Sequence, residues 1–219
     1  MPKLDQITFN FVKTKIPEKQ RIGKILDIGC GNGLYSCRNY DPKYLVGIDR
    51  DPLNRDKFER NLLQSGVNGK FYENFDELDE DALSLKFDLI SLIGVIELNS
   101  IDEVIDIIAR GSSYLSHGGY FFAVYYPWNP LSAFYFPYIF KGGKTYYENS
   151  SGIYVHSHSL KQIKKIMLDA GFEIHDAGVI NPYQSIFWSY SKLPEIIFSL
   201  KTAVELLPFG GRYILGKKL

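Results

Sequence analysis

The sequence has few cysteines, only Cys30 and Cys37 among 219 residues. Two thiols make neither a disulfide framework nor a set of metal ligands, so we expect a reducing compartment. A chain of this length buries a substantial hydrophobic core without disulfides or metals. These features predict one globular domain, residues 1–219, that is held together by its core.

The sequence also lacks net charge and long apolar runs. Its 25 lysine and arginine residues balance 25 aspartate and glutamate residues, and binding to nucleic acid needs a basic face, so no nucleic-acid partner is expected. No apolar run approaches the roughly 20 residues of a membrane-spanning helix, and residues 1–10 lack the apolar core of a signal peptide. We therefore expect a cytoplasmic protein without stable membrane insertion.

A glycine-rich turn is the most informative feature that is present. An apolar run at 24–28 contains Asp27, and three glycines then follow at alternate positions, Gly29, Gly31 and Gly33. This pattern predicts a buried parallel strand, a tight turn and the start of a helix at 34–39. Glycines let the main chain approach a ligand closely, and a helix start offers free N–H groups, so the turn predicts a nucleotide-like ligand.

Three residues narrow the identity of this ligand. A turn that binds a nicotinamide dinucleotide follows Gly-x-Gly-x-x-Gly, but Leu34 occupies the position of the third glycine. Asp27 would repel a pyrophosphate and suits a cationic ligand. Asp49 ends a second apolar run at 44–48, where its carboxylate can accept hydrogen bonds from both hydroxyls of a ribose.

These residues resemble the two leading motifs of the class I S-adenosylmethionine-dependent methyltransferases of the small-molecule type, and the resemblance extends over residues 24–180. It implies an α/β, doubly wound, Rossmann-like sheet of about seven strands, mostly parallel with an antiparallel last strand, and with helices on both faces. It implies S-adenosyl-L-methionine as cofactor and S-adenosyl-L-homocysteine as product. The cofactor-binding residues that it implies are Asp27, Gly29, Cys30, Gly31, Gly33, Asp49, Arg50, Phe75, Asp76 and Ile93.

Individual roles follow from the resemblance. In this family the turn after the third strand holds the adenine, so Phe75 is expected as its apolar wall and Asp76 as a hydrogen-bond acceptor. Ile93, after the fourth strand, is expected near the methyl group. The stretch 95–98 resembles the family's Val-x-Glu-His, but Leu98 replaces the histidine, and Gly94 stands where metal-assisted members have a glutamate. No metal site is expected.

Periodicity and turn residues divide the rest of the chain into elements. A helical segment is expected within residues 1–22. The predicted strands are 24–28, 44–48, 70–73, 87–92, 120–125, 171–174 and 212–216. The family resemblance implies that the last strand lies antiparallel between the fifth and the sixth. The predicted helices are 34–39, 51–65, 101–115, 160–170 and 194–206.

An insertion at 127–157, after the fifth strand, is rich in aromatic residues. At the carboxyl edge of a doubly wound sheet such a segment lies where substrates bind, so we interpret it as a lid over the acceptor. The alternative is that its aromatics complete a core under a long loop. The substrate-binding candidates, whose rings also suit a sulfonium by cation–π contact, are Tyr125, Tyr126, Trp128, Tyr135 and Tyr146.

An oxygen acceptor loses a proton during methyl transfer, and His156 or His158 is the candidate base. The alternative is that both are surface or capping residues. The predicted function is methylation of a small molecule, with O-methylation favoured and with a lipid, quinone, polyketide-like ring or sugar as acceptor. Two other hypotheses stay open here, a non-catalytic cofactor-binding module and a nicotinamide-dependent oxidoreductase. The oligomeric state does not follow from the sequence.

Overall fold

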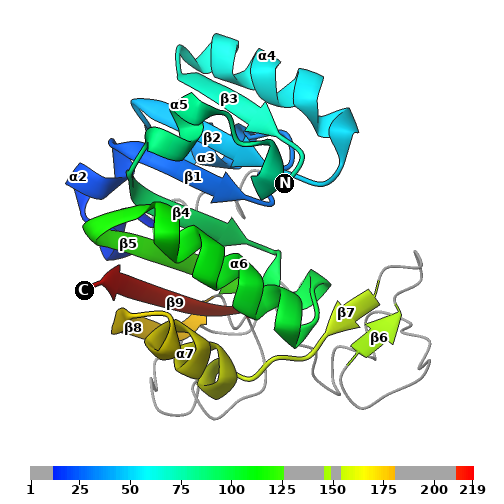
Figure 1. The fold of residues 1–219 in the computed structure, drawn as a ribbon, viewed down its shortest axis with the longest axis vertical. Coiled ribbons are helices and arrows are strands. Elements are labelled where there is room, and N and C mark those ends of the chain that lie inside the picture. The colour runs from blue at the N-terminus through cyan, green and yellow to red at the C-terminus, as the bar shows by residue number, and fades with distance from the viewer. Residues whose placement is uncertain (1–11, 126–145, 149–153, 181–210) are drawn as a thin grey trace, which may run out of the picture.

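The computed structural model describes residues 12–125, 146–148, 154–180 and 211–219. Figure 1 shows a central seven-stranded sheet in the order β3-β2-β1-β4-β5-β9-β8. Its strands are β1 (Lys24–Ile28), β2 (Tyr44–Ile48), β3 (Asn68–Tyr72), β4 (Phe87–Ile93), β5 (Leu115–Tyr125), β8 (Phe172–Ile180) and β9 (Gly211–Lys218).

The strand pairing confirms the predicted topology. Strands β1 to β5 pair in parallel, whereas β9 runs antiparallel to both of its neighbours, β5 and β8. The strand order reverses between β1 and β4, and ligands of open α/β sheets bind beyond the carboxyl ends of the strands at such a point. The topology therefore locates the functional site before any side chain is considered.

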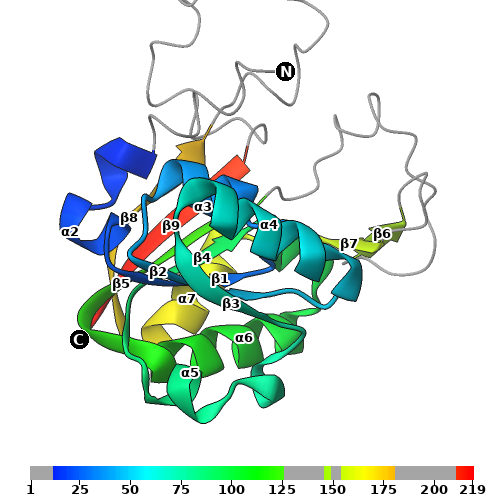
Figure 2. The ribbon, with the colours of Figure 1, turned by 90° about the horizontal axis from the view of Figure 1, so that it is seen from above.

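Helices cover both faces of the sheet, as Figure 2 shows. One face carries α2 (Glu18–Arg21), α3 (Leu34–Asn39) and α4 (Arg55–Ser65), and the other carries α5 (Glu80–Ser84), α6 (Ile101–Tyr114) and α7 (Leu160–Asp169). Alternate residues of β1 enter two cores, since Ile25 packs on the α3 and α4 side and Leu26 on the α6 and α7 side. Burial of both faces explains why the strands are almost continuously apolar.

Local signals set the ends of the main helices. A capping box of Ser100 and Glu103 begins α6, and α4 ends at Gly66, whose φ of 66° requires the left-handed region. The predicted helix 51–65 begins instead with a 3-10 turn, η1 (Pro52–Asn54), in which the Leu53 amide donates to the Asp51 carboxylate at 3.0 Å. The chain reaches regular α-helix only at Arg55.

Two stretches differ from the prediction. Residues 116–119, between the predicted helix 101–115 and the predicted strand 120–125, lie inside β5, because Leu115 already pairs with Phe87 before an irregularity leads to the pair of Tyr120 with Leu89. No helix is predicted between residues 74 and 86, yet α5 begins at the end of the acidic run 76–81, and its N-terminus is capped by the Asp79 carboxylate, which accepts a hydrogen bond from the Ala82 amide. The prediction missed this cap because Asp79 lies within a run of acidic residues.

Only part of the predicted insertion 127–157 falls within the described residues. It is a two-stranded antiparallel sheet of β6 (Tyr146–Glu148) and β7 (Tyr154–His156), and β7 packs against η3 (Ile96–Leu98) in the loop after β4. Tyr126, Trp128, Tyr135 and the predicted helix 194–206 lie outside the described residues, as does the side chain of Tyr146.

The N-terminal segment is helical at 12–15 and at α2, and residues 1–11 lie outside the described part. Across the described ranges, no helix has both the length and the apolar character that crossing a membrane requires.

Candidate functional site

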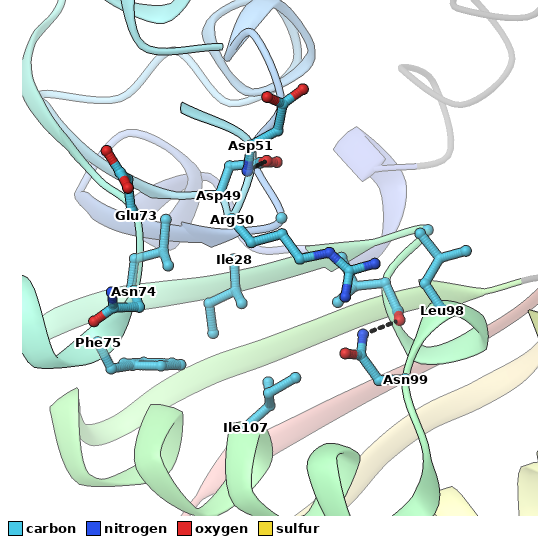
Figure 3. Close-up of a pocket in the computed structure, with 14 residues that line it drawn as sticks. Ile28, Asp49, Arg50, Asp51, Glu73, Asn74, Phe75, Leu98, Asn99 and Ile107 are labelled. Carbon is cyan, nitrogen blue, oxygen red and sulfur yellow. Dashed lines mark hydrogen bonds between the residues drawn. The ribbon is translucent and has the colours of Figure 1, made fainter. Parts of the chain in front are cut away.

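A cavity of about 320 Å³ opens at the carboxyl edge of the sheet, beside the point where the strand order reverses (Figure 3). Its walls come from the ends of β1, β2 and β3, from the loop after β4 and from α6. The lining residues are Ile28, Gly29, Ile48, Asp49, Arg50, Asp51, Glu73, Asn74, Phe75, Gly94, Val95, Leu98, Asn99 and Ile107.

The glycine turn is left-handed at all three predicted positions. The φ angles of Gly29, Gly31 and Gly33 are 71°, 51° and 70°, a region that favours glycine. A Cβ atom on Gly29 would lie 2.1 Å from Val95, and one on Gly33 would lie 2.5 Å from the ring of Phe58. A Cβ on Gly31 would meet no described atom within 4 Å. The packing of the chain therefore explains two of these glycines, whereas the space over Gly31 holds no described atom. Gly29 lines the cavity, but Gly31 and Gly33 do not, so their contact with a ligand stays a prediction.

Asp49 connects this turn to the end of β2. Its Oδ2 atom accepts a hydrogen bond from the Gly31 amide at 2.8 Å, and its Oδ1 atom accepts from the Asp51 amide at 2.9 Å and from Asn54 Nδ2 at 3.3 Å. A carboxylate has about four acceptor positions, so a hydroxyl donor can still be accommodated. The structure thus places Asp49 in the cavity wall, where a ribose acceptor was predicted.

Asp27 lies behind the turn. Its side chain is buried, and its Oδ2 atom accepts a hydrogen bond of 2.6 Å from Ser36 Oγ of α3. Burial raises the pKa of Asp27 to about 6, although hydrogen bonds from Ser36 and Ser91 act in the opposite direction. Asp27 is not among the residues that line the described cavity, so its contact with a cationic ligand stays a prediction.

Cys30 and Ile93 also lie outside the cavity lining. Both pack with the hydrophobic core on the α3 and α4 side, and burial raises the pKa of the Cys30 thiol. The Cys30 amide donates to the carbonyl of Ile48 at 3.1 Å, which helps to fix the turn. Their predicted contacts with the cofactor stay predictions.

The turn after β3 reaches the cavity through Phe75. Its ring is only 8% exposed and lies on the same side of the cavity as Ile107, opposite Ile28 (Figure 3). The side chain of Asp76 is 81% exposed and forms an ion pair with Arg110, and it does not belong to the cavity lining. Asn74, rather than Asp76, is the polar residue of this turn that lines the cavity.

Negative charge predominates around the cavity. Asp49, Asp51 and Glu73 line it, and Arg50 is the single arginine among the lining residues, although Glu73 is also paired with Arg55 at 3.2 Å. Figure 3 shows the Arg50 side chain extending from the end of β2 towards Asn99. An acidic wall attracts a cationic sulfonium and repels the two charges of a pyrophosphate.

The two predicted base candidates lie behind the Asn99 wall. His158 is buried, and its Nε2 atom lies 2.9 Å from the carbonyl oxygen of Asn99. The His156 ring stacks on it, with centroids 5.8 Å apart and an interplanar angle of 7°. Burial and the neighbouring His158 lower the pKa of His156, whereas Glu103 raises it. Neither histidine lines the described cavity.

Tyr125, at the end of β5, is fully buried. Burial raises the pKa of its phenol, and the nearby charges of Arg212 and Glu97 act in opposite directions. Within the described residues, no group hydrogen-bonds its hydroxyl.

The sequence prediction missed several wall residues. Gly94, Val95 and Asn99 belong to the loop after β4, and Ile107 reaches the cavity from α6. The carboxyl-edge rule pointed to this loop, because the loop follows a parallel strand beside the reversal of strand order. No local signal distinguished Ile107 from the other apolar residues of the helix.

Comparison with known proteins places this geometry in a family. The profile of the methyltransferase domain family matches residues 5–177. Among solved structures, an S-adenosylmethionine-dependent methyltransferase from Methanosarcina mazei is 20% identical with a TM-score of 0.63, and the match covers 95% of this chain and 97% of that one. Geranyl diphosphate C-methyltransferase from Streptomyces coelicolor is 13% identical with a TM-score of 0.66, covering 99% and 80%.

A third solved structure is longer than this chain. An O-methyltransferase family protein from Burkholderia thailandensis is 14% identical with a TM-score of 0.63, and the match covers 98% of this chain but 56% of that protein. No curated protein matches the sequence.

Fold and site together define a Rossmann-like methyltransferase. The chain belongs to the methyltransferase domain family, because the family profile covers most of its length. Several of the similar solved structures are named S-adenosylmethionine-dependent methyltransferases, and the open space over Gly31, the position of Asp49 and the acidic wall fit an adenosyl sulfonium. In the described ranges, no group of three or more potential ligands could hold a metal ion.

Proposed function

We propose that the protein methylates a small molecule, with oxygen as the favoured acceptor atom. The observation that carries the proposal is the combination of an acidic cavity with an open left-handed glycine, Gly31, whose amide is bonded to the Asp49 carboxylate. When bound, S-adenosylmethionine supplies a methyl group on a sulfonium, which is already a good leaving group. The protein therefore contributes mainly alignment and exclusion of water, effects worth roughly 7–11 kcal/mol in well-oriented systems.

The cavity walls divide between the parts of the cofactor. Phe75, Ile28 and Ile107 offer apolar surfaces suited to the adenine, and Asp49 offers acceptor atoms for the ribose. The turn at Gly29 and Gly31 allows the remaining chain of the ligand to approach the backbone. Such a binding mode leaves the methyl group near the loop after β4.

An oxygen acceptor requires a proton acceptor, and we assign His156 to this role. Its lowered pKa keeps the imidazole neutral at neutral pH, so it can accept the hydroxyl proton while the new C–O bond forms and the C–S bond breaks. His158 is the other candidate, and its Nε2 atom lies 2.9 Å from the Asn99 carbonyl oxygen.

The acceptor class is proposed from the aromatic insertion. Tyr126 and the residues Trp128, Tyr135 and Tyr146 offer rings that suit a lipid, a quinone, a polyketide-like ring or a sugar face. Tyr125, the fifth candidate, is fully buried at the end of β5, which does not support contact with an acceptor. Similar folds serve different acceptors, since one neighbour is named a geranyl diphosphate C-methyltransferase and another a 1,6-didemethyltoxoflavin N1-methyltransferase. The insertion is therefore the segment to vary when acceptors are compared.

Calorimetry with S-adenosylhomocysteine tests the proposal. We expect micromolar binding to the unmodified protein and at least tenfold weaker binding to Asp49→Ala, because the ribose loses its acceptor. Asp56→Ala, an exposed carboxylate on α4, is the matched control and should bind normally. Absence of binding at millimolar ligand would refute the proposal.

A second candidate function is a non-catalytic cofactor-binding module. It is favoured by Leu98, an apolar residue that lines the cavity where the family motif has a histidine. Incubation with a broad panel of hydroxylated metabolites separates the two, since an enzyme releases S-adenosylhomocysteine with at least one of them. Tight cofactor binding without turnover on any of them would favour the module.

A further inference from the structure

Arg110 of α6 contacts the adenine side of the cavity from outside. The centre of its guanidinium lies 4.7 Å from the centroid of the Phe75 ring, and the same group forms an ion pair with Asp76. One turn later on α6, the Tyr114 ring stacks nearly parallel to Phe75, with centroids 6.1 Å apart and an angle of 12°. The cavity wall at Phe75 is thus backed by one helix.

The turn that carries Phe75 is weakly held by its own backbone. It is a single 3-10 turn, η2 (Phe75–Glu77), and its hydrogen bonds from Glu77 to Asn74 and from Leu78 to Phe75 are both 3.4 Å long. Bonds of this length are near the geometric limit. Side chains of the turn itself add shorter hydrogen bonds, since the Asp76 amide donates to Asn74 Oδ1 at 2.8 Å and the Glu73 amide donates to Glu77 Oε2 at 3.1 Å. These bonds hold the backbone of the turn, whereas the Phe75 ring is contacted by Arg110 and Tyr114 of α6.

We propose that Arg110 is a positioning residue for the cofactor, acting through Phe75 and Asp76. Its planar guanidinium stacks on the ring while its charge holds the neighbouring carboxylate, so one side chain fixes both the wall and the turn. This inference rests on the proposed function in one respect only, that the adenine of the methyl donor lies against Phe75.

The proposal gives Asp76 a different role from the one predicted by family resemblance. An acceptor for the adenine amino group would point its carboxylate into the cavity, whereas the Asp76 carboxylate is paired with Arg110 and lies outside the cavity lining. The two roles predict that substitution of Asp76 affects the Kd values of different purine ligands differently. A direct hydrogen bond to the amino group matters only for adenine, whereas positioning of the wall matters for any purine.

The test compares S-adenosylhomocysteine with S-inosylhomocysteine, which lacks the amino group, by calorimetry on three variants. Arg110→Ala and Asp76→Asn should each raise the Kd of both ligands by roughly fivefold, the range of one cation–π contact or one exposed ion pair. The double variant should bind about as well as Arg110→Ala alone, because both changes remove the same restraint. If Arg110→Ala does not fold, Asp76→Asn alone still tests the proposal, because Asp76 is exposed and its substitution should leave the fold intact.

Two controls separate positioning from general destabilisation. Asp106→Asn removes the other carboxylate near Arg110, 4.0 Å away along the helix, and Arg60→Ala removes an exposed arginine from α4. Neither should change either Kd by more than about 1.5-fold. In a Phe75→Leu background, which removes the ring, Arg110→Ala should lose most of its effect.

The possible results lead to distinct conclusions. If the unmodified protein binds neither ligand, the proposed function fails. If it binds and Arg110→Ala binds equally well, the positioning role is wrong. If Asp76→Asn weakens only S-adenosylhomocysteine, Asp76 contacts the adenine directly and the proposal is overturned.

Discussion

Substitution of Gly31 by alanine should separate cofactor binding from stability. Gly31 and Gly66 both have left-handed φ angles, 51° and 66°, and at both positions a Cβ atom would meet no described atom within 4 Å. Alanine therefore incurs the same backbone strain at either site, about 1 kcal/mol, close to the lower end of the range for left-handed residues. For a chain of this size we expect the melting temperature to fall by about 2–4 °C in both variants.

Binding should differ between the two variants. Gly31 lies in the turn beside the cavity and its amide holds Asp49, whereas Gly66 ends α4 on the surface. A methyl group at Gly31 would occupy the space that we assign to the ligand, so we expect the Kd for S-adenosylhomocysteine to rise at least tenfold, about 1.4 kcal/mol. Gly66→Ala should bind like the unmodified protein.

Thermal melting gives the stability of each variant, and calorimetry gives its Kd. Equal Kd values for Gly31→Ala and Gly66→Ala would show that the space over Gly31 is not used by the ligand. A much larger loss of stability in Gly31→Ala alone would show that the turn tolerates less strain than the open geometry indicates. Either result would refute the reasoning.

Two further predictions concern buried polar groups. The pKa of Asp27 is raised from about 3.8 to about 6, so its contribution to folding is most favourable below about pH 4 and is lost as the pH rises through 6. Asp27→Asn should therefore be more stable at pH 7 by up to about 3 kcal/mol, and urea titrations from pH 4 to pH 7 should show a flatter dependence; an unchanged pH profile would contradict this account. Tyr125→Phe removes a buried hydroxyl that no described residue bonds, so chemical denaturation should show equal stability or a gain of about 1 kcal/mol. A loss of more than 1 kcal/mol would mean that this hydroxyl has a partner in the folded protein.

The glycine turn and the strands around it could be predicted because their signals are local. An apolar run followed by glycines at alternate positions can be recognised from neighbouring residues alone. All three glycines have left-handed φ angles in the structure. The same holds for α3 and β1, whose predicted and observed limits agree. The cap of α5 is also a local signal, but Asp79 lies in a run of acidic residues and the prediction missed it.

The environment of each acidic residue could not be predicted in the same way. Asp27 lies within β1 and is buried against Ser36, whereas Asp49 follows the end of β2 and lines the cavity. The cavity opens at the carboxyl edge of the sheet, and the groups that surround each carboxylate there come from distant elements. The motif alone therefore assigns more carboxylates to the ligand than the folded chain places in the cavity wall.

The sequence by itself determined where the central strands lie along the chain and the glycine turn, because hydrophobic period and the requirement for positive φ are properties of short segments. The order of the strands in the sheet and the class of ligand followed from the family resemblance that these motifs carry. Tertiary structure alone decided that Asp76 pairs with Arg110, 34 positions away, and that Ile107 of α6 completes the cavity wall. These contacts depend on how α6 packs across the sheet. That packing is stabilised by many core residues that are far apart in the sequence, so no single motif predicts it.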